Sequence, residues 1–303
     1  MSINVFNVKE TMKDYNPQLY WNERCIKYGH TGDADSLIYQ YDQPQRVRAI
    51  DKALSRAKVK LGEDSRILDV GCSTGDIISL FISKGISNVT GIDLSEEVIK
   101  SAKGRFAGNK NVELDVVGIE TAKFPSNMFD LVTSINVLQH IVDDDTFLGV
   151  VANIIRMVRM GGYVLIMEFS PIKAKARRTE PCVVIRSRRE YVDVFENNGC
   201  RLVCYFGLPR LGVRFLRSIF FKKAIGTLVR LIPKPVKRSL GTANKPASQL
   251  GEPSPQSAGK SPLDRIRKAV LTFFKPFDHL LVPFPYRYTD MPILIFRKVD
   301  KSE

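Results

Sequence analysis

The chain has 303 residues, enough for a complete α/β domain together with an insertion or a small second domain. Hydrophobic residues make up 44% and charged residues 26%, which is the composition of a globular protein and excludes a disordered chain. The formal net charge is +14, and residues 205–288 hold nearly all of it, because this segment has sixteen Lys and Arg but three Asp and Glu. The excess charge therefore concerns the partner of that segment rather than the fold.

Other features of the composition argue against membrane spans, disulfides and metal centres. No stretch approaches the roughly 18 continuous apolar residues of a membrane-spanning helix, and residues 1–20 lack the apolar core of a signal peptide. The five cysteines form no C-x-x-C pair and their number is odd, so we expect reduced thiols in a cytoplasmic protein. The three histidines are scattered, which is not the spacing of a zinc site, so we expect no metal.

Residues 1–62 are expected to form an N-terminal helical cap. They include the stretch YWNER, which contains the only tryptophan of the chain, Trp21, with Tyr20 beside it and Arg24 one turn further on. Apolar residues at helical spacing predict a second helix over 47–57, directly before the first expected strand.

Residues 63–206 alternate between strand and helix patterns, which predicts a parallel sheet with crossover helices. Ser95, followed by two glutamates, is typical of a helix N-cap. The pair Gly161 and Gly162 predicts the end of a helix over 144–159. The expected strands are 66–70, 89–92, 111–117, 129–134, 163–169 and 201–206, and a further helix is expected over 188–197.

The stretch 66–75, RILDVGCSTG, reads as a buried strand that turns through small residues into a helix, with which α/β folds build a nucleotide pocket. Its glycines allow a close approach of backbone to ligand, and the helix start offers free N–H groups. Asp93 ends the next strand roughly twenty residues on, where a ribose-binding acid is expected. A dinucleotide or another adenosine cofactor would fit. However, Asp76 replaces the third glycine of a dinucleotide motif, and the loop instead reads D-x-G-x-S-x-G.

This loop resembles the first motif of class I S-adenosylmethionine-dependent methyltransferases with a methyltransferase type 11-like domain. The resemblance implies S-adenosylmethionine as the cofactor and a Rossmann-like, doubly wound, seven-stranded sheet that is mostly parallel, with an antiparallel last strand at 292–297. Asp93 would accept both ribose hydroxyls, with helix capping beside Ser95 as the alternative, and Leu94 would pack on the adenine. The loop would meet the methionine part of the cofactor through Asp69, Gly71, Cys72, Ser73 and Gly75, with Asp69 either orienting the loop or meeting the ammonium group.

The next motif of the family departs from its usual form. Gly118 stands where these methyltransferases usually have an aspartate, so the resemblance implies the backbone of Ile119 and the carboxylate of Glu120 as partners of the adenine. A solvated surface acid is the alternative for Glu120. Residues 134–140, SINVLQH, resemble the fourth motif and would bring Asn136 to the place where the methyl group meets its acceptor.

Two residues are candidates for a catalytic base. His140 has a side chain of suitable pKa, and Glu168 lies at the carboxyl end of the fifth expected strand. Packing is the alternative for His140, and methyl transfer mainly requires alignment, so the lack of a base would not exclude the assignment. The YWxxR segment of the family implies that Tyr20 or Arg24 touches the cofactor. The other reading is that Trp21 simply packs its helix against the sheet.

Residues 207–288 are expected to form a basic helical insertion, followed by the last strand and C-terminal tail over 289–303. Basic and apolar residues at helical spacing predict helices over 208–232 and 263–284, and the Gly-, Ser- and Pro-rich stretch 241–262 predicts a flexible linker. Three roles stay open for this insertion: a lid over the acceptor pocket, a platform on an anionic membrane surface, and an RNA-binding surface.

Together with the resemblance, these features predict a methyltransferase that acts on an oxygen or nitrogen acceptor. The stretches YWNER and SRREY, the latter at 187–191, look similar to methyltransferases of glycan and cell-surface polymer pathways. This implies a sugar or lipid-linked acceptor and a cytoplasmic enzyme, with a peripheral place at the inner face of the membrane if the insertion is a membrane platform. The alternatives are a quinone-type or natural-product small molecule, a tRNA base, and a regulatory protein that binds the cofactor without catalysis. The intact Gly71, Asp93 and Asn136 argue against the last.

Overall fold

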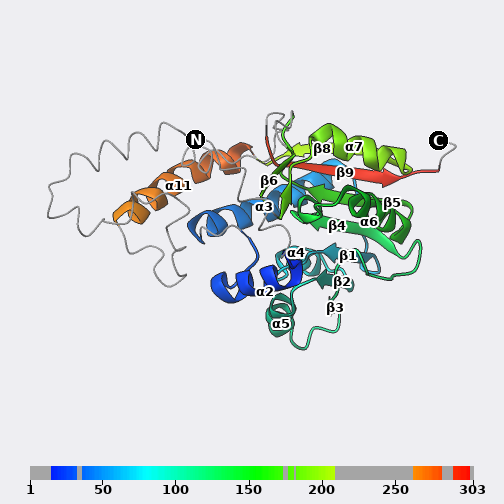
Figure 1. Cartoon of the computed structure of the whole chain (residues 1–303), viewed down its shortest axis with the longest axis horizontal. Helices are drawn as coiled ribbons and strands as arrows, with labels where there is room; N and C mark the ends of the chain where they lie inside the picture. Colours follow the sequence, from blue (N-terminus) through cyan, green and yellow to red (C-terminus); the bar gives the residue numbers. More distant parts are fainter. Residues whose placement is uncertain are drawn as a thin grey trace. The chain divides into compact units, whose positions relative to one another are not determined.

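The computed structural model describes residues 15–32, 36–172, 177–180, 182–208, 262–281 and 289–300 (Figure 1). The chain divides into two compact units. The first unit, which contains the sheet, is made of residues 1–31, 47–208 and 284–303, and the second of residues 32–46 and 209–283. The helix predicted over 208–232 and almost all of the linker predicted over 241–262 lie outside the described residues.

The first unit is built on a seven-stranded sheet with the strand order β3-β2-β1-β4-β5-β9-β8. The five strands β1 to β5 run parallel to one another, whereas β9 pairs antiparallel with both β5 and β8. This confirms the predicted Rossmann-like sheet with an antiparallel last strand. The strands are β1 (Arg66–Val70), β2 (Asn88–Asp93), β3 (Val112–Val116), β4 (Phe129–Ile135), β5 (Val158–Met167), β8 (Cys200–Gly207) and β9 (Pro292–Lys298).

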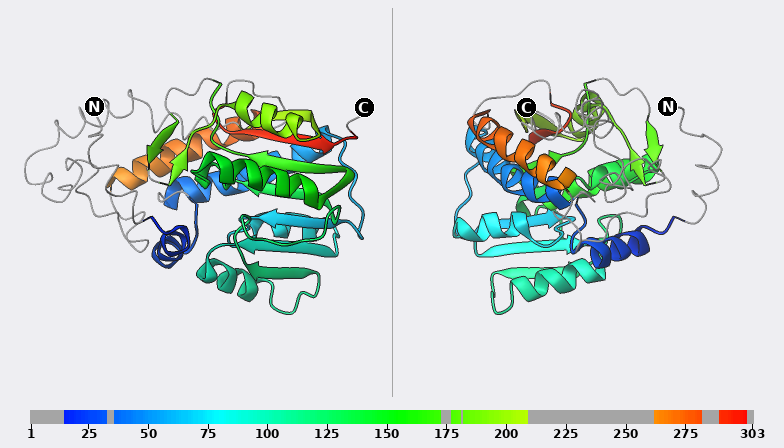
Figure 2. Two further views of the ribbon diagram at one scale, coloured as in Figure 1. Left: turned by 45° about the vertical axis from the view of Figure 1, so that its right-hand side comes forward. Right: turned by 90° about the vertical axis from the view of Figure 1, so that its left-hand side faces the viewer.

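Helices cover both faces of this sheet (Figure 2), and successive strand residues point alternately to the two faces. On one side, Leu68 and Val132 belong to a core cluster with Phe147 and Phe195 from two helices. On the other side, a Cβ at Gly91 would lie 2.6 Å from the Cδ1 atom of Ile78, so a third helix packs closely there. The crossover helices are α4 (Asp76–Ser83), α5 (Glu96–Arg105), α6 (Asp144–Met157) and α7 (Arg188–Asn197).

The helix starts follow from local sequence. Ser95 caps α5 as predicted, since its hydroxyl accepts a hydrogen bond from the Val98 N–H group, and Glu96 and Glu97 occupy the first turn. Helix α7 begins with a capping box in which Ser187 and Glu190 satisfy each other's backbone N–H groups.

The prediction that Gly161 and Gly162 stop the helix was wrong. Helix α6 ends earlier, at Met157, and the two glycines lie inside strand β5. Their stretch forms an irregularity in the pairing with β4, where a Cβ at position 162 would lie 2.9 Å from the carbonyl oxygen of Asp130. Glycine is therefore needed at position 162 for the close pairing of β5 with β4. In the sequence, a glycine pair of this kind cannot be distinguished from one that ends a helix.

Two further elements of the first unit lie outside the sheet. Helix α2 (Pro17–Tyr28) begins at its N-cap Asn16 and ends at Gly29, which has a φ of 75°. A short antiparallel ribbon, β6 (Arg178–Glu180) and β7 (Val183–Val184), had no counterpart among the predicted elements.

In the second unit, the described residues are helical. Helix α11 (Pro262–Leu281) confirms the helix expected after the linker, and its Leu271 clusters with Ile38 and Tyr41. Those two residues lie in the first half of α3 (Ser36–Arg56), which is much longer than the helix expected over 47–57. Tyr41 also donates a hydrogen bond from its hydroxyl to Asp278, at 2.5 Å. In the part of the chain that the structure describes, no helix combines the length and the apolar character of a membrane span.

Candidate cofactor and acceptor site

The loop after β1 has a tightly constrained backbone. Gly71, Ser73 and Gly75 all have positive φ values, of 66°, 49° and 86°. A Cβ at position 71 would lie 2.3 Å from the Cγ2 atom of Val137, in the loop after β4. The first glycine is therefore required both for its backbone conformation and for the close packing of two loops at the carboxyl edge of the sheet.

The other small residues of the loop pack against the elements beneath it. The buried Cys72 donates its N–H group to the carbonyl of Ile92, and its sulfur packs beside Gly91. Gly75 leaves room for the Phe106 ring, which would otherwise lie 2.3 Å from a Cβ. These contacts hold the loop in place from below, so that a ligand above the loop would meet main-chain groups.

The Asp93 carboxylate joins the ends of β1 and β2. One oxygen accepts a hydrogen bond from the Ser73 N–H group at 3.1 Å, and the other accepts one from the Ser95 N–H group at 3.0 Å. Burial raises the pKa of Asp93, against these backbone donors, which lower it. Each oxygen keeps acceptor capacity for a further donor, as a ribose diol would require. The N-cap of α5 is Ser95, so the alternative of Asp93 as the cap is wrong.

Asp69 provides a buried carboxylate at the end of β1. One of its oxygens accepts a hydrogen bond from the Thr133 hydroxyl at 2.7 Å, and the other has no hydrogen-bond partner among the described residues. Burial, with Asp93 and Asp76 nearby, raises the pKa of Asp69 to about 7. With 1% of its surface exposed, the carboxylate suits an electrostatic action on a cation above the loop better than a direct contact.

The predicted adenine side of the site is compact. A Cβ at Gly118 would lie 2.7 Å from a carboxylate oxygen of Glu120 and 3.2 Å from the Cδ1 atom of Leu94. The carboxylate of Glu120 therefore occupies the space that a side chain at position 118 would need, beside the residue expected to cover the adenine. Ile119 is buried, and its carbonyl accepts a hydrogen bond from Asn153.

Helix α2 is tied to the same edge of the sheet (Figure 1). The Ser95 hydroxyl donates to the side-chain oxygen of Asn22 at 2.7 Å, and the Thr31 hydroxyl donates to that of Ser73 at 2.8 Å. Arg24 donates from Nε to the carbonyl of Thr31 and from Nη1 to the hydroxyl of Tyr20. The residues of the YWNER stretch thus lie next to the glycine loop.

The short 3₁₀ turn η1 (Leu138–His140) follows β4. His140 is its last residue and lies four residues after Asn136. Its Nδ1 atom lies 2.8 Å from the carbonyl oxygen of Cys182, which accepts only, so Nδ1 carries the proton in the neutral ring. Nε2 then accepts from the side-chain amide of Gln139 at 3.3 Å, and the Trp21 ring packs edge-on at 4.8 Å between centroids. Burial lowers the pKa of His140 to about 4, so the ring is neutral near pH 7 and a weak base.

The structure gives Glu168 a task other than that of a catalytic base. Its oxygens accept hydrogen bonds from the backbone N–H groups of Val137, Leu138 and Gln139 at 3.0–3.3 Å, and only 1% of its surface is exposed. Burial raises the pKa of Glu168 to about 8, against these donors and Arg186, which lower it. A carboxylate enclosed in this way holds the turn that carries His140, so the expectation of a base at Glu168 is corrected.

Sequence reasoning missed Arg186, a fully buried arginine on the other side of this turn. Its guanidinium donates to the carbonyl oxygens of Leu138 and Ile141 at 3.3 and 3.0 Å, and to Asp144 at 2.9 Å. It also lies 3.8 Å from the centroid of the Phe147 ring. One of three arginines within four residues gives no sequence signal of burial, because most arginines lie at the surface.

Tyr15 was also missed. Its ring packs edge-on against Tyr20 at 5.8 Å, and Tyr20 packs in turn against Trp21 at 4.9 Å. The Tyr15 hydroxyl is buried with no hydrogen-bond partner in the described part of the chain, and burial with Cys182, Tyr20 and Glu120 nearby raises its pKa. These three rings, of Tyr15, Tyr20 and Trp21, form a row from the side of Glu120 to His140, which we call the aromatic wall.

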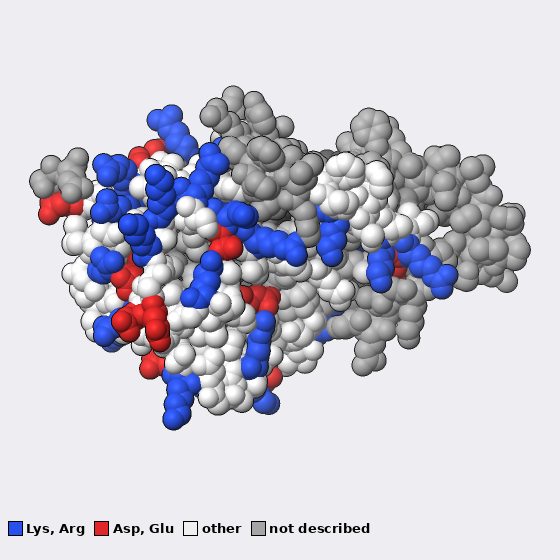
Figure 3. All heavy atoms as spheres, turned by 180° about the vertical axis from the view of Figure 1, so that it is seen from behind, with Lys and Arg blue, Asp and Glu red and all other residues white. Residues whose placement is uncertain are grey.

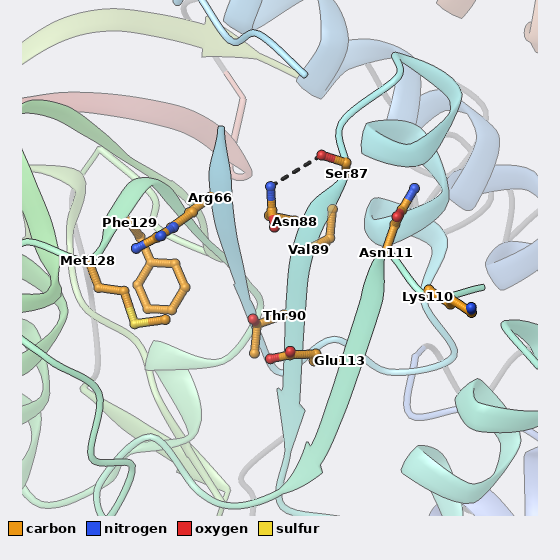
Figure 4. Close-up of a pocket in the computed structure, with 10 residues that line it drawn as sticks. All are labelled: Arg66, Ser87, Asn88, Val89, Thr90, Lys110, Asn111, Glu113, Met128 and Phe129. Atoms are coloured by element: carbon orange, nitrogen blue, oxygen red, sulfur yellow. Dashed lines mark hydrogen bonds between the residues drawn. The ribbon is translucent and has the colours of Figure 1, made fainter. Parts of the chain in front are cut away.

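A hollow of about 210 Å³ lies at the opposite edge of the sheet and does not belong to this site (Figure 4). Arg66 and Asn88 in its lining stand at the starts of β1 and β2. Ligands of parallel α/β sheets bind beyond the carboxyl ends of the strands, which favours the edge with the glycine loop. Within the described ranges, no group of His, Cys, Asp and Glu side chains suits a metal ion.

Comparison with known proteins agrees with this geometry. Residues 67–162 match the family described as "Methyltransferase domain". A ubiquinone/menaquinone biosynthesis C-methyltransferase from Geotalea daltonii is 31% identical over 146 residues, which are 45% of this chain and 61% of that protein. A phosphoethanolamine N-methyltransferase from Zea mays is 30% identical over 135 residues, 44% of this chain and 26% of that protein. The chain thus spans less than two thirds of the length of these relatives.

A solved S-adenosylmethionine-dependent methyltransferase from Methanosarcina mazei is 22% identical, covers 48% of this chain and 84% of its own, and has a TM-score of 0.41. The match of residues 67–162 to a methyltransferase domain agrees with the predicted resemblance to class I S-adenosylmethionine-dependent methyltransferases. The predicted cofactor is confirmed as that of the family. The similarity to glycan-pathway enzymes is not established by these matches.

Proposed function

We propose that the protein is an enzyme that moves a methyl group from S-adenosylmethionine to a small-molecule acceptor. The observation that carries this proposal is the glycine loop at 71–75. The loop is closed against Val137, its Ser73 N–H group is bound to the Asp93 carboxylate, and the buried Asp69 lies at its start. A loop held in this way exposes its main chain to the ligand and places negative charge beneath a cation.

The bound cofactor would supply a methyl group on a sulfonium, which is already an activated leaving group. The residues of the chain bind and orient it. Asp93 accepts the ribose hydroxyls with the lone pairs that Ser73 and Ser95 leave free, and Gly71, Cys72, Ser73 and Gly75 shape the main chain beside the methionine part. Leu94, the Ile119 N–H group and the Glu120 carboxylate receive the adenine. Asn136, Tyr20 and Arg24 line the side toward the acceptor, and Asp69 offsets the positive charge of the cofactor.

We infer that alignment and exclusion of water, not strong base catalysis, carry the transfer. The neutral ring of His140, fixed by Cys182 and Gln139, packs against Trp21 and can accept a proton only weakly. An acceptor that needs little deprotonation, or one that loses its proton to water, would suit this environment.

For the acceptor we propose a sugar or lipid-linked small molecule that is methylated on oxygen or nitrogen in the cytoplasm or at the inner face of the membrane. The aromatic wall supports an acceptor with a flat or apolar face, since sugars and isoprenoid or acyl groups pack on aromatic rings. By their names, one of the two relatives methylates carbon and the other nitrogen. Membership of the family therefore does not determine the acceptor atom, which depends on the acceptor pocket of each protein.

The proposal is tested by incubating the full chain with S-adenosylmethionine labelled in its methyl group, together with separate glycan, lipid, quinone and tRNA fractions. Label in the glycan or lipid fraction supports the proposed acceptor. Label in the quinone or tRNA fraction would assign one of the alternative acceptors. Cofactor binding without transfer to any fraction would favour a regulatory protein and contradict the enzymatic proposal.

A further inference from the structure

Helix α11 of the second unit presents an exposed apolar stripe. Ile266, Phe273 and Phe277 follow one another at spacings of seven and four residues, which places them on one line along a helix. Their exposed fractions are 40%, 63% and 47%. The stripe extends over roughly 16 Å of helix. Large apolar side chains arranged in such a row, and not scattered singly, indicate an interaction surface.

A different face of the helix is already occupied within its unit. Leu271 packs with Ile38 and Tyr41, and Asp278 is fully buried and accepts the hydrogen bond from the Tyr41 hydroxyl. The stripe is therefore not the face by which α11 joins its own unit.

The charges that α11 exposes all have the same sign among its described side chains. Arg265, Lys268 and Lys275 are exposed; helical geometry places Arg265 about a quarter turn from the stripe, and Lys268 and Lys275 on the side of the helix away from it. The two carboxylates of the helix are engaged elsewhere, because Asp264 pairs with Arg267 at 3.3 Å and Asp278 with Tyr41. In the sheet-bearing unit, by contrast, acidic side chains lie among the basic ones on the face shown in Figure 3.

We propose that α11 docks the protein on an anionic lipid surface, with the apolar stripe in the headgroup and acyl boundary and the three basic side chains on the headgroups. Helices that lie in a membrane interface carry apolar side chains on one side and basic side chains on the other, and the long basic side chains reach the headgroups. The segment around α11, residues 205–288, has a net charge of +13, which adds long-range attraction to an anionic surface. This inference concerns the location of the protein and does not depend on methyl transfer.

Single-stranded RNA is a weaker fit to the same surface. RNA-binding platforms offer free aromatic faces on which bases stack. Here the rings of Phe273, Phe274 and Phe277 pack against one another, with centroids 5.3–6.4 Å apart. The rings thus form a continuous apolar ridge in place of separate stacking positions, which favours insertion among lipid chains.

The test uses the full chain in co-sedimentation with phosphatidylcholine vesicles that contain about 30% phosphatidylserine, and with pure phosphatidylcholine vesicles. We expect binding to the anionic vesicles that weakens with added salt, and at least about tenfold weaker binding to the neutral ones. The double variant Phe273→Ser/Phe277→Ser should weaken binding by at least about tenfold, because two apolar side chains no longer enter the interface. Lys268→Glu/Lys275→Glu should weaken it by about fivefold or more per charge.

Matched controls come from the sheet-bearing unit. Leu148→Ser/Met160→Ser removes two side chains that are 46% exposed, and Lys100→Glu/Lys103→Glu reverses two exposed charges on α5. Both controls should bind vesicles as the unchanged chain does. Equal loss in the controls, or no binding of the unchanged chain to anionic vesicles, would overturn the inference.

Two other occupants are also outcomes of the test. A shift of RNA by the full chain that the phenylalanine variant abolishes, without vesicle binding, would assign the surface to RNA. A dimer in sedimentation velocity that the same variant dissociates, again without vesicle binding, would assign it to a second copy of the chain. Both results overturn the lipid proposal. Calorimetric binding of S-adenosylmethionine by the same preparations shows separately whether the cofactor site is intact, so the two proposals can fail independently.

Discussion

Glu168 and Arg186 hold the same turn from two sides. Glu168 accepts hydrogen bonds from the N–H groups at the start of the turn η1, whereas Arg186 donates to carbonyl oxygens at its start and end, those of Leu138 and Ile141. Both side chains are fully buried, and neither reaches the predicted cofactor loop by any hydrogen bond between described residues. They are positioning residues for Asn136 and His140.

Removal of Arg186 should therefore destabilise the protein more than it weakens cofactor binding. For Arg186→Ala we expect a fall of about 3 kcal/mol in the free energy of unfolding, because buried carbonyl oxygens lose their donor and Glu168 loses the nearby positive charge. The rate of methyl transfer should fall while the Kd of S-adenosylmethionine changes less than about threefold. Urea denaturation and calorimetry measure both quantities. Arg189→Ala, at the second residue of α7 and with a side chain that is 87% exposed, is the control and should change stability by no more than about 0.5 kcal/mol.

Substitution of Gly71 should abolish cofactor binding through the loop backbone. In Gly71→Ala the new Cβ meets Val137 and occupies a left-handed conformation, so we expect a loss of about 2–4 kcal/mol in the free energy of unfolding. Gly85→Ala is a matched control, since Gly85 also has a positive φ, of 82°, but nothing within 4 Å of its Cβ position. Its loss should be about 1 kcal/mol, with cofactor binding retained. Equal effects of the two substitutions would show that backbone strain alone, and not the contact with Val137, constrains the loop.

The affinity for S-adenosylmethionine should depend on pH through Asp69. The pKa of Asp69 is about 7 in the free protein, and a cation above the loop favours the ionised carboxylate, so binding should release a proton. The Kd should then decrease as the pH rises from 6 to 7 and level off above about 8. Calorimetry in two buffers of different ionisation enthalpy measures the released proton directly. A Kd that does not change over this range, or an unaltered dependence in Asp69→Asn, would contradict this role of Asp69.

Stability should fall as the pH rises above neutrality. Burial raises the pKa of Asp69 to about 7 and that of Glu168 to about 8, so the folded state holds protons that the unfolded state has lost. Their contribution is complete below pH 4, declines as the pH rises above the pKa values of the unfolded state, and is gone above about pH 8. We expect a decrease of about 2 kcal/mol in the free energy of unfolding between pH 6.5 and 8.5. His140 has the opposite effect at lower pH, because its lowered pKa costs stability below pH 6.5. Urea denaturation of Asp69→Asn should show a smaller decrease.

His140 should affect the rate less than a catalytic base would. A true general base contributes about 10²- to 10⁴-fold, whereas the loss of a packed, neutral ring should reduce kcat by less than about tenfold in His140→Gln. The pH profile of kcat should also lack a limb near pH 6.5. A loss of a hundredfold or more, with such a limb in the unchanged enzyme, would restore His140 as the base.

The sequence predicted the sheet and the glycine turn between β1 and α4 well, because their signals are local. Buried strands are continuous apolar runs, and the order D-x-G-x-S-x-G needs only short-range geometry. Ser95 was recognised as an N-cap for the same reason. The predicted end of α6 at the glycine pair failed because the signals for a helix stop and for close strand pairing are identical in one dimension.

The enclosure of the turn after β4 could not be predicted. Glu168 was placed correctly at the carboxyl end of β5, but the direction of its side chain depends on where the N–H groups of the turn lie. The burial of Arg186 depends on carbonyl oxygens that lie 45 or more residues away in the sequence. The extension of α3 to Ser36 likewise depends on its packing with Leu271 of α11, which no local pattern encodes.

The central claim, a methyl-donor site organised by the loop at 71–75 and Asp93, is tested most directly by calorimetric titration of the full chain with S-adenosylmethionine and with its demethylated product. We predict that the unchanged protein binds both and that Asp93→Ala weakens binding at least about tenfold, since the ribose diol loses its acceptor and Ser73 its backbone partner. Asp115→Ala, which removes an exposed carboxylate on β3, should bind as the unchanged protein does. No binding of either ligand by the unchanged protein, or equal binding by Asp93→Ala, would contradict the account.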